Sequence, residues 1–203
     1  MTGAGPGDHE GDESEDTVPT YRQRQRPFGP EVTWRLEPDH LVADSGLRSG
    51  RVPYAGIAAI RLTYAPTNIT STAFKTAIRT TDGKSMTFGS LSWRTYFEVD
   101  RQDRAYRDFL GELLRRAEEA NPGVELIAGK PKVVWLGAAV VGLATTLAMA
   151  GAMAWAVGTG AWTLAALAAL FLAPFAWQWW GMVTRNRPGR FRADAVPAAL
   201  MPD

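Results

Sequence analysis

Two long stretches near the C-terminus contain no charged side chain and no histidine. They run from residue 133 to 157 and from residue 161 to 184. At 1.5 Å per residue, a helix over either stretch would be about 36 Å long, more than the ~30 Å hydrocarbon core of a bilayer. We therefore predict two transmembrane helices, over about 133–157 and 161–183, within a hairpin of residues 131–184. A hairpin buried in a soluble protein is the alternative, but the rest of the chain is small for burying both helices.

Tryptophans lie at both ends of these stretches. Indole rings prefer the boundary between lipid and water, so we predict that they anchor the hairpin at the two membrane surfaces. Basic residues precede the first helix and follow the second, and the turn has none, which places both termini in the cytoplasm by the positive-inside rule. The predicted anchors are Trp135, Trp155, Trp162, Trp177, Trp179 and Trp180.

Alanine recurs every four residues in each predicted helix. Residues four apart share a helix face, and small side chains let two helices approach closely in lipid. We predict that the two alanine stripes pack against each other. They are Ala144, Ala148, Ala152 and Ala156 in the first helix, and Ala161, Ala165, Ala169 and Ala173 in the second. The alternative is that alanine is simply common in these helices.

Residues 31–130 show shorter periods. Hydrophobic and polar positions alternate in several runs, the pattern of strands with one buried face, and Asp82-Gly83 predicts a tight hairpin turn. From Tyr106 to Ala117 the hydrophobic spacing changes to three and four, which predicts an amphipathic helix. We expect a small antiparallel sheet or partly open barrel capped by one C-terminal helix. The chain would then be an α+β membrane protein.

Composition limits the available chemistry. The chain has 203 residues, a net charge of +1 and no cysteine, which gives no basic field for nucleic acid and excludes disulfides and thiol chemistry. Residues 1–30 form an acidic and then basic segment that we predict to be disordered, and residues 185–203 a basic cytoplasmic tail. The first basic run could touch anionic lipid or could be a solvated linker.

No catalytic constellation is visible. His9 lies in the acidic segment, and His40 follows Asp39 in a predicted turn. Ser45 or Ser49 could partner His40, but neither lies in a nucleophile elbow. We predict no enzyme, no cofactor and no metal site.

Six basic residues of the sheet region could hold lipid phosphates or a protein partner by charge-assisted hydrogen bonds. Basic and acidic residues nearly balance over residues 31–130, which favours the alternative that they form a solvated outer face of the sheet. The six are Arg48, Arg51, Arg61, Lys75, Arg79 and Lys84.

The segment LVADSGLRSGRVPYAGI resembles the core of the bacterial pleckstrin-homology-like domains, in which a short strand, a Gly-Leu turn, a basic residue and a Pro-x-x-x-Ile stretch recur. The matching positions are Leu41, Gly46, Leu47, Arg51, Pro53, Tyr54 and Ile57. The resemblance covers about residues 31–120 and implies a pleckstrin-homology-like domain, a type often joined to membrane helices. In many such proteins the helices come first, whereas here they come last. The whole chain is also similar to small two-helix bacterial membrane proteins, a likeness that brings no activity with it.

Together these features predict a non-catalytic scaffold or interaction module in the bacterial inner membrane, which binds a protein partner or its own copies through the cytoplasmic domain. An accessory subunit that docks into a larger membrane complex through its helix pair is the alternative. A weaker alternative is a sensor of anionic lipid. Membrane lipids and a protein partner or second copy are the expected partners, and nucleic acid is not.

Overall fold

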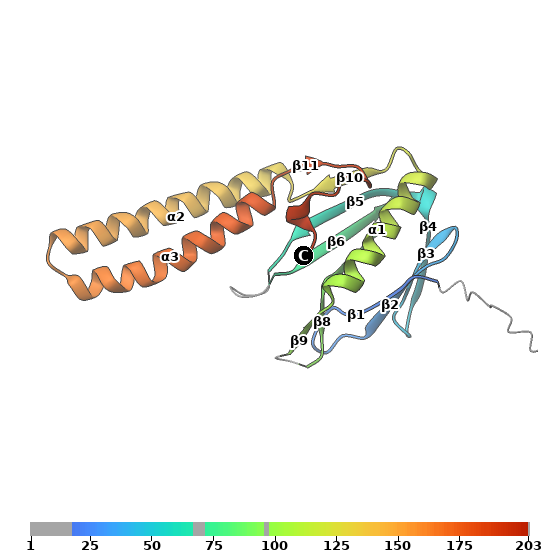
Figure 1. The fold of residues 1–203 in the computed structure, drawn as a ribbon, viewed down its shortest axis with the longest axis horizontal. Coiled ribbons are helices and arrows are strands. Elements are labelled where there is room, and N and C mark those ends of the chain that lie inside the picture. Colours follow the sequence, from blue (N-terminus) through green and yellow to red (C-terminus); the bar gives the residue numbers. More distant parts are fainter. Residues whose placement is uncertain (1–17, 67–71, 96–97, 203) are drawn as a thin grey trace, which may run out of the picture.

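Short strands with alternating buried and exposed side chains build two sheets around one amphipathic helix, and a long helical hairpin projects from them (Figure 1). The computed structural model describes residues 18–66, 72–95 and 98–202. The first sheet is antiparallel in the order β1-β2-β3-β4. Its strands are β1 (Thr20–Arg24), β2 (Glu31–Leu36), β3 (His40–Asp44) and β4 (Ser49–Pro53).

The second sheet has the order β11-β10-β5-β6-β7. Strand β10 runs parallel to β5, and the other pairs are antiparallel. Its strands are β5 (Ile57–Tyr64), β6 (Phe74–Thr80), β7 (Ser85–Gly89), β10 (Glu125–Ala128) and β11 (Gly189–Arg190). Strands β8 (Leu91–Trp93) and β9 (Val99–Arg101) form a separate pair, and 3-10 turns cover Tyr54–Gly56 and Ala198–Leu200.

Helix α1 (Asp103–Ala120) closes the core between the sheets. Its buried side chains are Tyr106, Phe109, Leu110, Leu113, Leu114 and Ala117, so the helix and the face predicted from the spacing are confirmed. Arg116 ties the exposed side of α1 to the first sheet by donating to the carbonyl oxygens of Leu36 and Glu37, at 2.9 and 2.8 Å.

The sheet domain begins earlier than predicted. Residues 20–24 were expected in a disordered segment, but they form β1, which pairs with β2 along its whole length. Tyr21 and Gln23 point inward, and Gln23 also accepts from the backbone N–H of Gly89 on β7, at 3.0 Å. The charged Arg22 and Arg24 hid this strand in the sequence, although Arg22 is exposed and Arg24 is partly buried. Residues 1–17 of the predicted segment lie outside the described residues.

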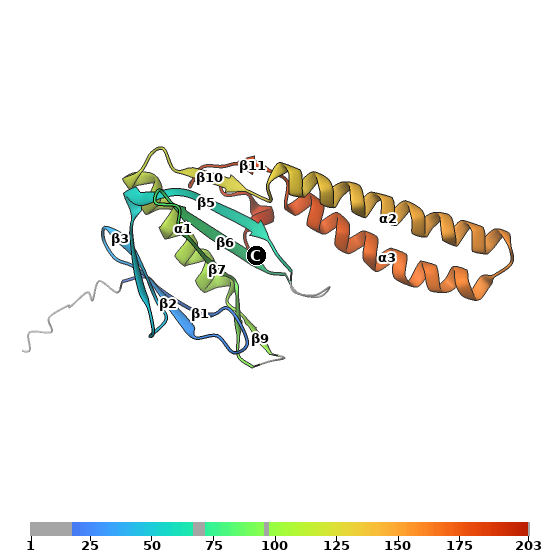
Figure 2. The same cartoon turned by 180° about the vertical axis from the view of Figure 1, so that it is seen from behind.

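The C-terminal residues, predicted as a basic tail, return to the sheet domain. Strand β11 pairs with β10, and Leu200 is buried in the core with only 2% of its surface exposed. The helical hairpin is therefore an insertion between two neighbouring strands of one sheet, and Figure 2 shows β10 and β11 side by side at its base. Both chain segments that flank the hairpin lie at the same end of it.

The hairpin consists of α2 (Lys132–Gly158) and α3 (Trp162–Arg185), each within two residues of its predicted bounds. Both helices are long and apolar enough to cross a membrane. Only Gly142, Ala156 and Ala165 are buried in them, so the rest of the chain does not cover the hairpin.

The predicted alanine seam is wrong for most of its length. Ala156 and Ala165 are buried near the turn and Ala161 is partly covered, but the other five predicted alanines are exposed. Positions four apart advance by 400°, so a four-residue stripe drifts about 40° per step around the helix. Most shielded positions of α2 instead alternate steps of four and three, the spacing that keeps one face on a partner helix. These are Trp135, Ala139, Gly142, Thr146, Met149, Met153 and Ala156, and the neighbouring Thr145 and Ala150 are also partly covered.

The tryptophans divide into two groups. Trp135 donates from Nε1 to the carbonyl oxygen of Val183 at 2.8 Å, and Trp179 donates to that of Ala138 at 3.2 Å, so these two cross-link the helices near the domain. Gly142 makes room for this contact, because a Cβ there would lie 1.8 Å from Nε1 of Trp179. The other four predicted anchors are exposed. Trp155 and Trp162 lie at the turn, and Trp177 and Trp180 lie at the domain end.

Candidate functional site

A groove between β4 and the β6–β7 turn brings together three of the six predicted contact residues, Arg48, Arg51 and Lys84. Its volume is about 1040 Å³. Strand β4 supplies one wall with all five of its residues, and residues on both sides of the Asp82-Gly83 turn supply the other. The groove exists because Gly83, at φ +83°, reverses the chain tightly, in the position where the sequence predicts a hairpin.

The charges of this groove are mostly positive and only partly neutralised. Lys84 pairs with Asp82 at 2.8 Å. The hydrogen bonds from Lys84 and Thr80 lower the pKa of Asp82 to about 2, and the same contact with Asp82 raises the pKa of Lys84. Neither Arg48 nor Arg51 has a carboxylate within 4 Å in the described part of the chain. The groove thus offers two unpaired guanidinium groups and one paired ammonium.

The other three predicted contact residues lie elsewhere. Arg61 donates to the carbonyl oxygen of Gly129 at 3.0 Å, and Arg79 lies 3.9 Å from Glu125. Lys75 lines a separate hollow of about 170 Å³ beside Gln23. The six basic residues therefore do not form one surface. Arg48, Arg51 and Lys84 line the groove, whereas Arg61, Lys75 and Arg79 lie on the outward face of β5 and β6 in the second sheet.

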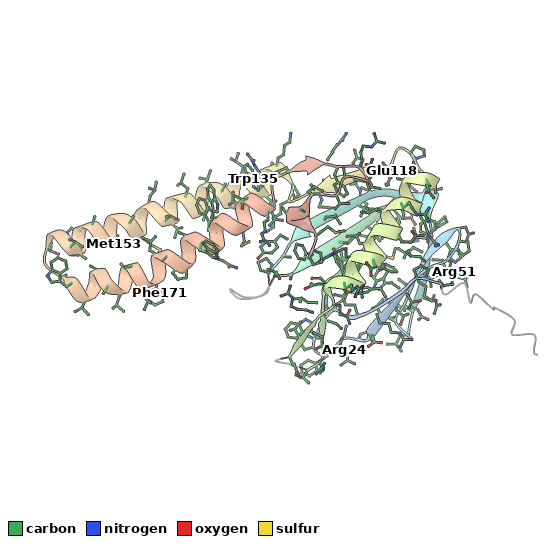
Figure 3. The ribbon with its side chains drawn as sticks, viewed as in Figure 1. Arg24, Arg51, Glu118, Trp135, Met153 and Phe171 are labelled. Carbon is green, nitrogen blue, oxygen red and sulfur yellow. The ribbon has the colours of Figure 1, made fainter. Side chains whose placement is uncertain are left out.

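The groove lies at the end of the domain opposite the hairpin. Figure 3 shows Arg51 at the far side of the first sheet and Trp135 at the base of the helices, with the second sheet and α1 between them. If the hairpin crosses a membrane, that membrane lies at the hairpin end of the domain, whereas Arg51 lies at the other end.

A second cluster joins the hairpin to the domain. Asn186, which follows α3 and is only 1% exposed, pairs with the backbone of Tyr64 like another strand residue. Its Oδ1 accepts from the Tyr64 N–H at 3.0 Å, and its Nδ2 donates to the Tyr64 carbonyl oxygen at 2.9 Å. Gly129 lies against the same residue: its φ is +70°, and a Cβ there would lie 2.4 Å from the carbonyl oxygen of Asn186. Both ends of the hairpin are thereby fixed to the end of β5.

Cations surround this junction. Arg185 lies over the ring of Tyr64, 4.9 Å from its centre. Lys130, Lys132 and Arg187 have no carboxylate within 4 Å among residues 18–66, 72–95 and 98–202. The sequence has no Asp or Glu from residue 126 to 193, so the base of the hairpin is uniformly basic.

The residues considered as catalytic candidates make hydrogen bonds to neighbouring turn residues. His40 is bonded to Asp39 next to it. The Ser45 hydroxyl accepts from the Arg48 N–H at 3.2 Å and donates to the Arg48 carbonyl oxygen at 3.0 Å, which closes the β3–β4 turn. Within the described residues, no three His, Cys, Asp or Glu side chains form a group that could hold a metal ion.

Sequence reasoning missed the residues that define the junction and the helix contact, namely Gly129, Gly142 and Asn186. Glycine within a charge-free helix and Asn after its last turn are weak signals, since both are common for other reasons. The hydrogen-bond partner of Asn186 is 122 positions earlier in the chain, and no local pattern could have indicated it.

No protein-family model matches this sequence, and a search of curated proteins finds no match either. The functional argument therefore rests on the groove, the junction and the hairpin themselves.

Proposed function

We propose that this protein is a membrane-anchored, non-catalytic interaction module. The hairpin spans the bacterial inner membrane, and the sheet domain stands in the cytoplasm with both chain termini. The domain presents its basic groove, lined by Arg48, Arg51 and Lys84, to a protein partner.

The surface of the hairpin supports membrane insertion. Large apolar side chains point outward along both helices, a surface that is unfavourable in water. The exposed Trp162 lies 15 residues before Trp177 and 18 before Trp180, or about 22–27 Å along α3, close to the thickness of a hydrocarbon core. The uniformly basic junction suits the anionic cytoplasmic leaflet, which supports the proposed orientation.

The order of elements supports a pleckstrin-homology-like domain. Four antiparallel strands, β1 to β4, precede three more, β5 to β7, and α1 follows and closes the core. This arrangement agrees with the resemblance of residues 41–57. Strands β10 and β11 are additions that connect the domain to the hairpin.

The observation that carries the proposal is the combination of a fixed junction with a groove at the opposite end. Asn186 and Gly129 hold the domain in one orientation relative to the hairpin. The groove then faces away from the membrane, where a cytoplasmic partner reaches it more easily than a headgroup of the same bilayer does.

The test is native mass analysis of the full chain, extracted with its partners in mild detergent. We expect a stoichiometric partner or second copy that is retained by the wild type and lost with Arg48→Glu/Arg51→Glu. Arg79→Glu is the matched control, because Arg79 is also basic and exposed but lies outside the groove. The proposal would be contradicted if the protein is recovered alone, or if the partner co-purifies equally well with Arg48→Glu/Arg51→Glu.

One observation favours the second candidate, an accessory subunit that docks through its helices. Ala144, Ala148 and Ala152 leave a small-residue face of α2 uncovered, and such faces admit close packing of another helix in lipid. If this candidate is right, replacing Ala148 with Leu removes the co-purified subunit and the groove variant does not.

A further inference from the structure

Strand β4 is an edge strand of the first sheet. The hydrogen bonds at its two ends show which of its residues bond to β3. The Ser45 N–H donates to the Arg48 carbonyl oxygen at 3.0 Å, and the Tyr54 N–H donates to the Asp39 carbonyl oxygen at 3.3 Å. Bonded and non-bonded residue pairs alternate in an antiparallel ladder. Gly50 and Val52 therefore bond to β3.

The intervening residues direct their backbone groups the other way. Ser49 and Arg51 each turn one N–H and one C=O toward the groove, and Pro53 turns a C=O there. No backbone partner from the second sheet pairs with them, because β4 has β3 as its one neighbour among the described strands. The groove is thus bordered by an open strand edge, which is a template for one more strand.

The side chains around this edge are mostly basic, so they favour a strand that carries negative charge. Arg48 precedes β4 and Arg51 lies in it, neither has a carboxylate within 4 Å among the described residues, and Lys84 lines the groove from the β6–β7 turn. Asp82, the one acidic lining residue, already pairs with Lys84. An added strand with carboxylates on alternate residues would place them on one face, within reach of these cations.

We propose that the β4 edge binds an extended acidic segment of a protein partner as a fifth strand of the first sheet. This inference rests on the proposed function and specifies its recognition mode: backbone bonds to Ser49 and Arg51 supply the register, and the cations of the groove supply the selectivity. The distance of the groove from the hairpin favours a protein segment over a headgroup of the membrane that anchors the chain (Figure 3).

The experiment uses the full chain in phosphatidylcholine nanodiscs and three fluorescent decapeptides. Five Thr-Glu repeats can form an acidic strand, and five Thr-Lys repeats reverse the charge. Five Pro-Glu repeats with N-methylated glutamates keep the charge but have no backbone N–H at any residue, so this Pro-Glu peptide cannot donate to β4 in any register. We expect the Thr-Glu peptide to bind, the Pro-Glu peptide to bind at least about tenfold more weakly, and the Thr-Lys peptide not to bind.

Two variants at one position separate charge from backbone. Arg51→Gln removes the guanidinium and is expected to weaken Thr-Glu binding by about two- to fivefold, less at high salt. Arg51→Pro also removes the outward N–H and is expected to weaken it by a further two- to tenfold or so. Proline is compatible with this register, since Pro53 occupies an equivalent position, and the β3 bonds of Gly50 and Val52 remain. Hydrogen exchange of the Arg51 amide should slow when the peptide binds.

Equal binding of the Thr-Glu and Pro-Glu peptides, or equal affinities of the two Arg51 variants, would overturn strand addition. If the Thr-Glu peptide fails to bind while a natural partner still depends on Arg48 and Arg51, the inference fails and the proposed function stands. If phosphatidylglycerol nanodiscs occupy the groove and displace the peptide, the ligand is a lipid headgroup and the inference is wrong. Loss of both peptide binding and the co-purified partner in the wild type would remove the proposed function as well.

Discussion

Replacing Asn186 with alanine should loosen the hairpin from the sheet domain without unfolding either. The side chain makes two hydrogen bonds to the backbone of Tyr64 and one to the carbonyl oxygen of Met182, at 3.0, 2.9 and 3.1 Å. Asn186→Ala leaves the N–H and C=O of Tyr64 without these partners, and Tyr64 is buried. A buried polar group that loses its partner costs about 1–3 kcal/mol, so the two groups together cost about 2–6 kcal/mol.

This cost corresponds to a factor of about 30 to 25,000 in the equilibrium between docked and undocked hairpin. The chain has no cysteine, so spin labels can be attached at Leu47→Cys and Thr163→Cys without background. These positions are exposed and lie on the domain and at the start of α3, respectively. We expect a single narrow distance distribution in the parent chain and a broad one in Asn186→Ala, with faster amide exchange at Tyr64.

Asn121→Ala is the matched control. Its Nδ2 also donates to a backbone carbonyl, that of Ile57 at 3.0 Å, but the bond lies within the sheet domain. This variant should lower the free energy of unfolding and leave the label distances narrow. An unchanged distribution and unchanged Tyr64 exchange in Asn186→Ala would refute the idea of a rigid junction.

Three further predictions concern the hairpin, the core and the pH response. Gly142→Leu should separate α2 from α3, because the new side chain would collide with Trp179, whereas Ala148→Leu should leave disulfide trapping between introduced cysteines unchanged. Leu200→Ala should reduce the free energy of unfolding in denaturant by about 2–5 kcal/mol, since this side chain fills the core of the sheet domain; an effect below 1 kcal/mol would contradict that placement. Hydrogen bonds from Arg115 lower the pKa of Glu112 to about 2. This interaction therefore stabilises the fold by about 1 kcal/mol at most, fully above pH 4.5 and less as the pH falls toward 2. The free energy of unfolding of Glu112→Gln, measured over this pH range, should not show that decrease.

The elements with a strong local period could be predicted well. The length of the charge-free stretches predicted α2 and α3 to within two residues, because a helix of that length and composition needs no partner information to be recognised. The three- and four-residue spacing from Tyr106 to Ala117 likewise predicted the buried face of α1. The Asp82-Gly83 turn was predicted because few dipeptides suit a tight hairpin.

The candidate site was predicted only in part. Charge and strand position suggested Arg48, Arg51 and Lys84, but the same reasoning also suggested Arg61, which the structure places against the Gly129 carbonyl. Whether two basic residues share a groove depends on how the sheets pack. That packing is set by contacts between distant residues, which leave no trace in a local pattern.

The sequence by itself determined the two apolar helices, the amphipathic helix and the strand-rich composition of the domain, because each follows from a repeat within about twenty residues. Only the tertiary structure decided that β1 belongs to the sheet, that Leu200 completes its core, and that the helices meet at Gly142 rather than along the alanine stripes. The physical reason is common to all three. A side chain is buried or bonded by what lies next to it in space, and here the neighbours are separated by tens to more than a hundred residues of chain.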